Sequence, residues 1–325
     1  MMTSSISSTP RGKANQIETS ETCRSGTRGA TPTSTTSIYT SFDDLTNCYD
    51  DSSNIDAIIE ELNSQVHSNE NWRVHFDAIE SLRVLNKYYS NETRMHLSKL
   101  IPFLQRSLES LRSNLSKNTL MLIKEVFQYY RYSHTSDNFL DEILPIILEK
   151  AVSEKGFLKN EAKAALKALE KTGCNNNVVQ VLCNKSFDKN GIISEVSFQS
   201  LTEIIQEAKE NLTDKISQEY IGVLFSTIAK SIDGKRAVNK RMAKNLCEQL
   251  KDIFSENGTD FELFLKEKLK IKESEIKIIS EALKKNSKCT KPDFSCFIKT
   301  KKLKQESDKS SNIPFTLIAI NLKKQ

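Results

Sequence analysis

The sequence predicts an all-α protein built as an α-solenoid, a row of stacked helix pairs, and three observations favour this fold class. The 325 residues include only nine Gly and six Pro, too few for the frequent turns of β-sandwiches and barrels. A mean hydropathy of −0.47 is too low for one thick core and favours a thin packing of helices. Apolar residues also recur at helical spacing through most of the chain.

Composition divides the chain into three segments. Residues 1–52 are predicted to be a disordered arm, because Ser and Thr make up 20 of the first 50 residues and aliphatic periodicity is almost absent. Residues 53–286 carry the helical pattern and form the predicted folded unit. Residues 287–325 are predicted to be a basic, disordered tail, since positions 284–304 hold eight Lys and one Asp, a net charge of +7.

Amphipathic stripes in the folded unit predict alternating first and second helices. One stripe consists of Val74, Ala78, Leu82 and Leu85, which share one helical face. First helices are expected near residues 54–66, 92–110, 137–152, 177–184, 216–231 and 259–269. Second helices are expected to begin near residues 72, 115, 159, 192, 237 and 272.

The second helices recur in steps of 43, 44, 33, 45 and 35 residues. Two-helix HEAT repeats have a period of about 40–47 residues, and three of the five steps match it. The sequence therefore predicts about six two-helix HEAT-like repeats. An irregular helical bundle is the alternative, but a bundle has no reason to repeat at this period.

Motifs for catalysis or metal binding are missing from the sequence. The four His residues form no HExxH motif, and Ala229 stands where a P-loop ending at Gly234 and Lys235 needs its first Gly. The N-terminal residues 1–15 contain no apolar run, and the seven Cys form no CxxC pair, which favours reduced thiols in the cytoplasm. We expect a cytoplasmic non-enzyme with no metal, no cofactor and no membrane span.

Charge is sorted between the two kinds of turn. The five turns inside the first five pairs hold eleven basic residues against Asp188 alone, a net charge of +10, whereas the five turns between pairs sum to −4. In a solenoid, all within-pair turns line one long edge. The sequence therefore predicts one basic edge, with Arg73, Arg112, Lys117, Lys155, Lys159, Lys185, Lys189, Lys235, Arg236, Lys240 and Arg241.

Two aromatic residues lie in the same turns. Trp72, the only Trp of the chain, is in the first turn and Phe157 is in the third. Each could fasten the entry of its helix or serve as an exposed anchor for a partner, since aromatic residues are enriched at binding hot spots. Both interpretations stay open at this point.

Four stretches make the chain resemble a TOG domain, the tubulin-binding HEAT array of microtubule regulators, most closely of the CLASP and crescerin (TOGARAM) type. Residues 71–73 are similar to the first-turn Trp motif, and residues 111–117 are similar to the second-turn Leu-Arg-Ser motif. Residues 157–159 resemble the third-turn Phe-Ile-Arg motif, and residues 240–242 resemble the Arg-Lys pair that opens the second helix of the fifth repeat. The likeness spans residues 54–286, and the fourth turn departs from it by carrying Asp188.

The resemblance implies a microtubule-associated protein, in the cytoskeleton and in a cilium or flagellum, that presents the within-pair turns to a curved αβ-tubulin dimer. It implies that the first turns face β-tubulin and that the fifth turn faces α-tubulin. Tubulin is an acidic partner, which suits a basic edge. A chain with one such domain needs a dimer, a partner or the basic tail as a second attachment. The implied contact residues are Trp72, Arg73, Arg112, Lys117, Phe157, Lys159, Lys189, Lys235, Arg236, Lys240 and Arg241.

Two other functions are compatible with the fold. An ARM/HEAT adaptor would hold another protein on its concave helices, and would show a ladder of polar or aromatic residues along one helix of each pair, which the sequence lacks. Nucleic-acid binding through the tail would need interleaved aromatic residues for stacking, and residues 284–304 offer only Phe294 and Phe297. We therefore expect tubulin or microtubules as the partner, and no nucleic acid.

Overall fold

The computed structural model describes residues 38–50, 54–68, 71–129, 138–172, 174–255 and 260–286. The chain divides into two compact units, Met1–Leu45 and Thr46–Gln325, and the helices of the described residues lie in the second unit. Most of the predicted arm at residues 1–52, and the whole of the predicted tail at residues 287–325, lie outside the described residues.

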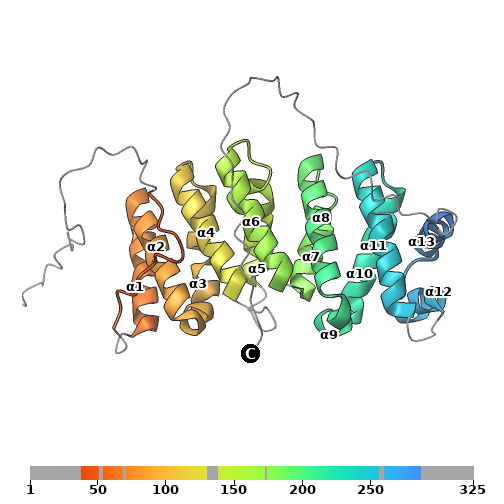
Figure 1. Ribbon diagram of the computed structural model, residues 1–325, viewed down its shortest axis with the longest axis horizontal. Coiled ribbons are helices and arrows are strands. Elements are labelled where there is room, and N and C mark those ends of the chain that lie inside the picture. Colours follow the sequence, from red (N-terminus) through yellow and green to blue (C-terminus); the bar gives the residue numbers. More distant parts are fainter. Residues whose placement is uncertain are drawn as a thin grey trace, which may run out of the picture. The chain divides into compact units, whose positions relative to one another are not determined.

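The predicted all-α solenoid of helix pairs is confirmed, and the pairs follow one another in chain order (Figure 1). The first helices are α1 (Ile55–Ser68), α3 (Ser90–Glu109), α5 (Asn138–Lys150), α7 (Asn176–Lys185), α10 (Gln218–Asp233) and the short α12 (Phe261–Leu263). The second helices are α2 (Trp72–Tyr88), α4 (Ser113–Tyr129), α6 (Gly156–Thr172), α8 (Gly191–Glu207), α11 (Ala237–Ser255) and α13 (Glu273–Asn286).

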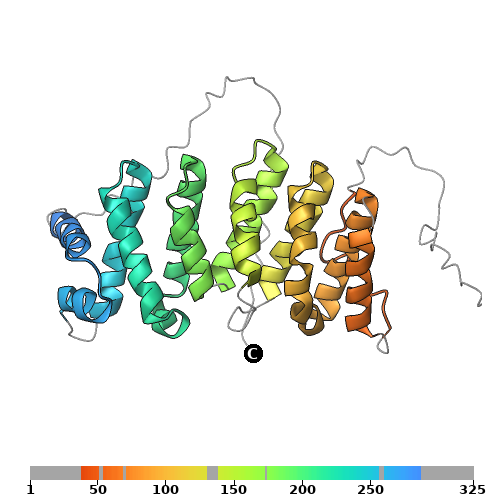
Figure 2. The ribbon, with the colours of Figure 1, turned by 180° about the vertical axis from the view of Figure 1, so that it is seen from behind.

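The helices form two layers, seen from opposite sides in Figures 1 and 2. The second helices α2, α4, α6, α8, α11 and α13 each pack on the next, and so do the first helices α1, α3, α5, α7 and α10. The apolar stripes face the space between the layers, as shown by the complete burial of Leu85 in α2 and of Phe198 in α8. This regular stacking places successive within-pair turns next to one another.

The pattern is irregular in two places. The expected helix at 259–269 is instead α12 followed by a π-helix, η2 (Phe264–Lys268), in which the Leu269 amide donates to the Phe264 carbonyl at 3.2 Å. A short 3-10 helix η1 (Lys209–Asn211) and α9 (Leu212–Lys215) also connect α8 to α10. Neither detail follows from apolar periodicity.

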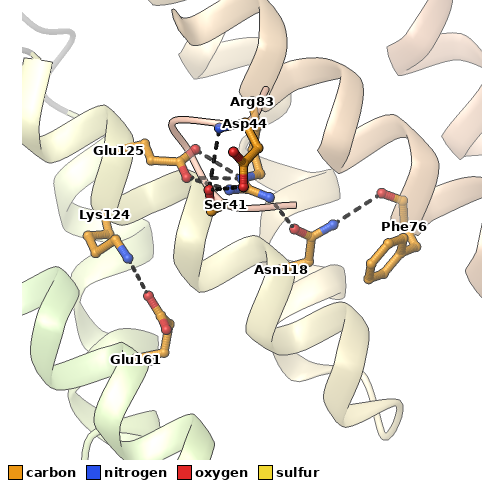
Figure 3. A network of polar contacts seen from close by, with 8 residues as sticks. All are labelled: Ser41, Asp44, Phe76, Arg83, Asn118, Lys124, Glu125 and Glu161. Carbon is orange, nitrogen blue, oxygen red and sulfur yellow. Dashed lines mark hydrogen bonds and ion pairs between the residues drawn. The ribbon is translucent and has the colours of Figure 1, made fainter. Parts of the chain in front are cut away.

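Polar side chains inside the solenoid connect α2 to α4 (Figure 3). The Arg83 guanidinium is fully buried and donates to both carboxylate oxygens of Glu125, at 2.7–3.0 Å. It also donates to the Asn118 side-chain oxygen at 3.2 Å, and the Asn118 amide in turn donates to the Phe76 carbonyl at 3.3 Å. A buried ion pair needs this degree of hydrogen bonding to offset the loss of hydration.

None of the helices among the described residues is both long enough and apolar enough to span a membrane. Two of the thiols in the described residues lie in the core, Cys183 on α7 and Cys247 on α11. Burial raises the pKa of each to about 12. Both thiols are therefore protonated at neutral pH and are poor nucleophiles.

Candidate functional site

The within-pair turns and the first turns of the second helices form one edge of the solenoid, here called the ridge: residues 71–75, 110–117, 151–159, 186–192 and 234–241. Contacts between neighbouring turns demonstrate this arrangement. The Arg112 guanidinium lies 6.0 Å from the centroid of the Trp72 ring, and the Lys155 ammonium donates to the Ser113 hydroxyl at 2.5 Å. Arg236 connects the fifth turn to the fourth. The ridge is thus continuous within each of these two groups of turns.

Short polar side chains fix the conformation of the ridge turns. Asn71 and Asn190 cap α2 and α8, and their side-chain oxygens accept from the amides two residues later, at 3.1 and 3.0 Å. Ser116 in α4 donates to the Leu108 carbonyl in α3 at 2.8 Å, across the second turn. Ser194 in α8 bonds the Ser186 carbonyl in the same way across the fourth turn. The turns are therefore held by the helices that they join.

Exposed apolar side chains gather on the ridge. Leu111 in the second turn is 97% exposed, and Phe157 in the third is 44% exposed. Phe187 and Ile192 in the fourth turn are also exposed, as is Val238 in the fifth. Exposed apolar groups ringed by polar ones are typical of protein-binding surfaces. The ridge therefore has the composition of an interface.

Most of these apolar residues escaped the sequence analysis. Phe157 was predicted as a contact residue, whereas Leu111, Phe187, Ile192 and Val238 were not. The signal that could have revealed them is that each lies in a within-pair turn or the first turn of a second helix, off the apolar stripe that the neighbouring helix buries. Such residues have no partner in the core and need another reason to be apolar.

All eleven predicted contact residues lie in the ridge turns or in the first two turns of the following helix. Six of them are exposed and available to a partner: Arg73, Arg112, Phe157, Lys189, Lys235 and Arg241. Five are half-buried: Trp72, Lys117, Lys159, Arg236 and Lys240. The structure therefore brings the predicted residues together on one edge, with unequal exposure.

Trp72 has contacts that fit both interpretations made from the sequence. Its ring meets the ring of Phe76 edge-on in the next turn of α2, at 6.4 Å between centroids and 82° between planes. The guanidinium groups of Arg73 and Arg112 lie 5.8 and 6.0 Å from its centroid. The ring therefore packs against its own helix and also lies beside two cations.

The fourth turn differs from its neighbours because its acid and two of its backbone carbonyls lie beside basic side chains. The Lys185 ammonium lies 3.6 Å from the Asp188 carboxylate, so the acid of the fourth turn has a cation beside it. The Arg236 guanidinium donates to the backbone carbonyls of Asp188 at 2.8 Å and Lys189 at 3.4 Å. Arg236 therefore connects the fifth turn to the fourth.

Replacing Arg236 with Gln should loosen the fourth turn. Loss of two charge-assisted hydrogen bonds is expected to cost about 1–2 kcal/mol locally. Amide hydrogen exchange of residues 186–190 should accelerate about tenfold or more, which corresponds to that free energy. The neighbouring Lys235→Gln is the matched control, because Lys235 is exposed, and it should leave exchange unchanged. Equal exchange in both variants would contradict the positioning role of Arg236.

The side chains of the ridge are suited to binding a protein surface. Among the described residues, no group of three or more His, Cys, Asp and Glu is arranged to hold a metal ion. What the ridge does present is a row of ammonium and guanidinium groups interleaved with apolar side chains. This combination suits an acidic protein surface that has apolar contacts of its own.

A family model described as CLASP N terminal matches residues 53–234, more than half of the chain. The chain belongs to the CLASP N-terminal family. The resemblance to a TOG domain of the CLASP type is thereby confirmed. TOG domain families bind tubulin and regulate microtubule dynamics, and their members are structural modules with no known enzymatic activity. The family match covers the first four turns and ends just before Lys235 of the fifth.

Three solved structures that are similar to this chain have low sequence identity to it. The "MAST/Orbit N-terminal domain" is 13% identical, with 70% of this chain and 97% of that chain covered, at a TM-score of 0.43. A structure described as "TOG-tubulin binding specificity promotes microtubule dynamics and mitotic spindle formation" is 16% identical, with 69% and 86% covered, at a TM-score of 0.46. An engineered protein is 14% identical, with 71% and 96% covered, at 0.34. No curated protein sequence matches the chain.

Proposed function

We propose that this protein binds αβ-tubulin through the ridge and thereby regulates microtubule assembly or stability. Membership of the CLASP N-terminal family supports tubulin as the partner. The observation that carries the proposal is the coincidence on one edge of exposed apolar side chains and basic side chains. Leu111 beside Arg112 and Phe157 near Lys155 are examples.

The binding mode follows from this composition. Basic groups attract the acidic surface of tubulin and accelerate association, and salt weakens this contribution. Apolar anchors then remove water from the centre of each contact and slow dissociation. As the resemblance implies, the first turn and its neighbours would face β-tubulin and the fifth turn would face α-tubulin. We extend the proposal to the cytoskeleton and, from the crescerin-type likeness, to a cilium or flagellum.

We also propose how the chain is divided into domains. Residues 53–286 would be the tubulin-binding domain, flanked by an arm at 1–52 and a basic tail at 287–325. The tail, with its excess of Lys, would add attraction to the acidic microtubule surface and so act as a second attachment beside a single TOG-like domain.

Replacing Leu111 with Ser should weaken tubulin binding about tenfold or more, because an interface anchor typically contributes more than about 1 kcal/mol. The measurement is a titration of labelled αβ-tubulin with the full chain at low and moderate salt. Met95→Ser is the matched control: Met95 is also exposed, at 78%, but lies in the first turns of α3, outside the ridge. Equal affinity of both variants and the wild type would refute the assignment of the ridge.

A further inference from the structure

A groove of about 710 Å³ runs along one face of α10. Its floor consists of α10 residues spaced three and four apart, from Glu219 through Val223 and Ser226 to Lys230. One wall is the end of α7 with Phe187, and the other is the segment 268–272 that leads into α13. The groove is thus lined along nearly the whole length of one helix.

The backbone of segment 268–272 is built to lie close against α10. A Cβ atom on Gly222 would be only 3.3 Å from the Leu269 carbonyl oxygen, so the absence of a side chain permits the close approach. The next residue, Lys270, has a φ of 52°, in the left-handed region that Gly prefers. Strained residues of this kind are concentrated at functional sites. Here the residue with the positive φ is a Lys, although Gly would adopt this conformation more easily.

The groove carries a marked excess of positive charge. Four exposed Lys line it, namely Lys230, Lys268, Lys270 and Lys272. None of the four ammonium groups lies within ion-pair distance of a carboxylate in the described part of the chain. Of the two acids that line the groove, Glu275 accepts a hydrogen bond from the Ser226 hydroxyl at 2.9 Å. Glu219 is the other, at the opposite end of α10 from Lys230.

We propose that this groove binds an extended acidic segment of a partner protein. The four ammonium groups supply the charge complementarity, and Val223 and Phe187 supply apolar contact. From Glu219 to Lys230 the helix spans about 16 Å at 1.5 Å per residue. An extended chain rises about 3.3 Å per residue, so the groove fits about five residues.

The observations favour a peptide over a single-stranded nucleic acid. Nucleic-acid grooves interleave basic groups with several aromatic rings on which bases stack. Phe187 is the one aromatic side chain among the residues that line this groove, and it lies at one end. Peptide side chains need no such stacking platform.

The groove also leads to the ridge. A smaller cavity of about 210 Å³ shares Phe187 and Lys230 with it and is lined by Lys235 and Arg236. A partner seated on the fifth turn could therefore extend an acidic segment into the groove. The groove would nevertheless bind an acidic peptide by itself, so this inference stands apart from tubulin binding.

The test uses the full chain and a fluorescein-labelled peptide of five consecutive Glu flanked by Gly and Ser, followed by fluorescence anisotropy. Saturable binding that weakens with salt is expected. Joint replacement of Lys268, Lys270 and Lys272 by Gln should weaken it at least about tenfold, and Glu219→Gln should tighten it about twofold to threefold. The same three-Lys-to-Gln change at Lys163, Lys167 and Lys171, exposed on α6, should have little effect.

Three results would overturn the proposal. These are the absence of saturable binding, an equal loss in both triple variants, and displacement of the peptide by a five-nucleotide oligothymidine at equal concentration. If circular dichroism shows that the groove variant has lost helix, Lys270→Gly with Lys272→Gln replaces it, because Gly suits the positive φ. The assay contains no tubulin, so its failure and failure of the proposed function remain distinguishable.

Discussion

Replacing Arg83 with Met lowers the free energy of unfolding by about 3–5 kcal/mol, because it leaves a buried carboxylate without its cation. Glu125 is 1% exposed and receives three hydrogen bonds from the Arg83 guanidinium. The joint variant Arg83→Met with Glu125→Leu should recover most of the loss, since no unpaired charge remains. Urea denaturation measures all three proteins.

The loss of stability in the Arg83→Met variant should depend on pH. Burial raises the pKa of Glu125, and Arg83 opposes that shift, so removing Arg83 raises the pKa further. The folded state then binds a proton at higher pH than the unfolded state, and stability falls as pH rises through this pKa. The deficit of the variant should therefore shrink as pH is lowered from about 7 towards 5.

An exposed ion pair provides the control for this prediction. Lys99 and Glu60 lie 2.6 Å apart, with side chains 57% and 60% exposed. Removing such a pair has little effect on the free energy of unfolding, because water solvates the partner that remains. A similar, small loss in Arg83→Met and Lys99→Gln would mean that the buried pair does not fasten α2 to α4.

Joint reversal of Lys240 and Arg241 to Glu should weaken tubulin binding about a hundredfold or more. It changes the charge of the fifth turn by four units and sets acids against an acidic partner. Folding should be unaffected, because both positions lie in the first turns of α11, where the helix dipole favours acids. Circular dichroism and tubulin affinity are the two measurements.

A matched charge reversal distinguishes the effect of the position of the two residues from the effect of the change in net charge. Lys163→Glu with Lys167→Glu makes the same change on exposed positions of α6, away from the ridge. It should weaken binding only by the long-range attraction that salt screens. If both double variants lose affinity equally, the fifth turn has no special role.

The helix pairs could be predicted because local periodicity determines them. The stripe through Ala78, Leu82 and Leu85 is buried as expected, and the second helices begin within about three residues of the predicted positions. The π-helix at Phe264–Lys268 could not be predicted from apolar periodicity, and neither could the close passage of Leu269, the residue that follows it, over Gly222. Such contacts join residues nearly fifty positions apart.

The basic character of the candidate site could be predicted from the sequence, whereas the contacts and exposure of individual side chains could not. Basic residues in turns at a regular interval show the edge directly in the sequence. The capture of Arg236 by two backbone carbonyls of the fourth turn cannot be seen there, because it needs the distance between two repeats. The exposure of Leu111 and Phe187 likewise depends on where the turns project from the helix layers.

Gel filtration of the full chain with purified αβ-tubulin at low and moderate salt is the direct test of tubulin binding. We expect a complex that elutes ahead of either protein at low salt and that dissociates partly as salt is raised, because charge supplies part of the attraction. Separate elution at both salt concentrations would contradict it. The solenoid would then remain as the fold, without tubulin as its partner.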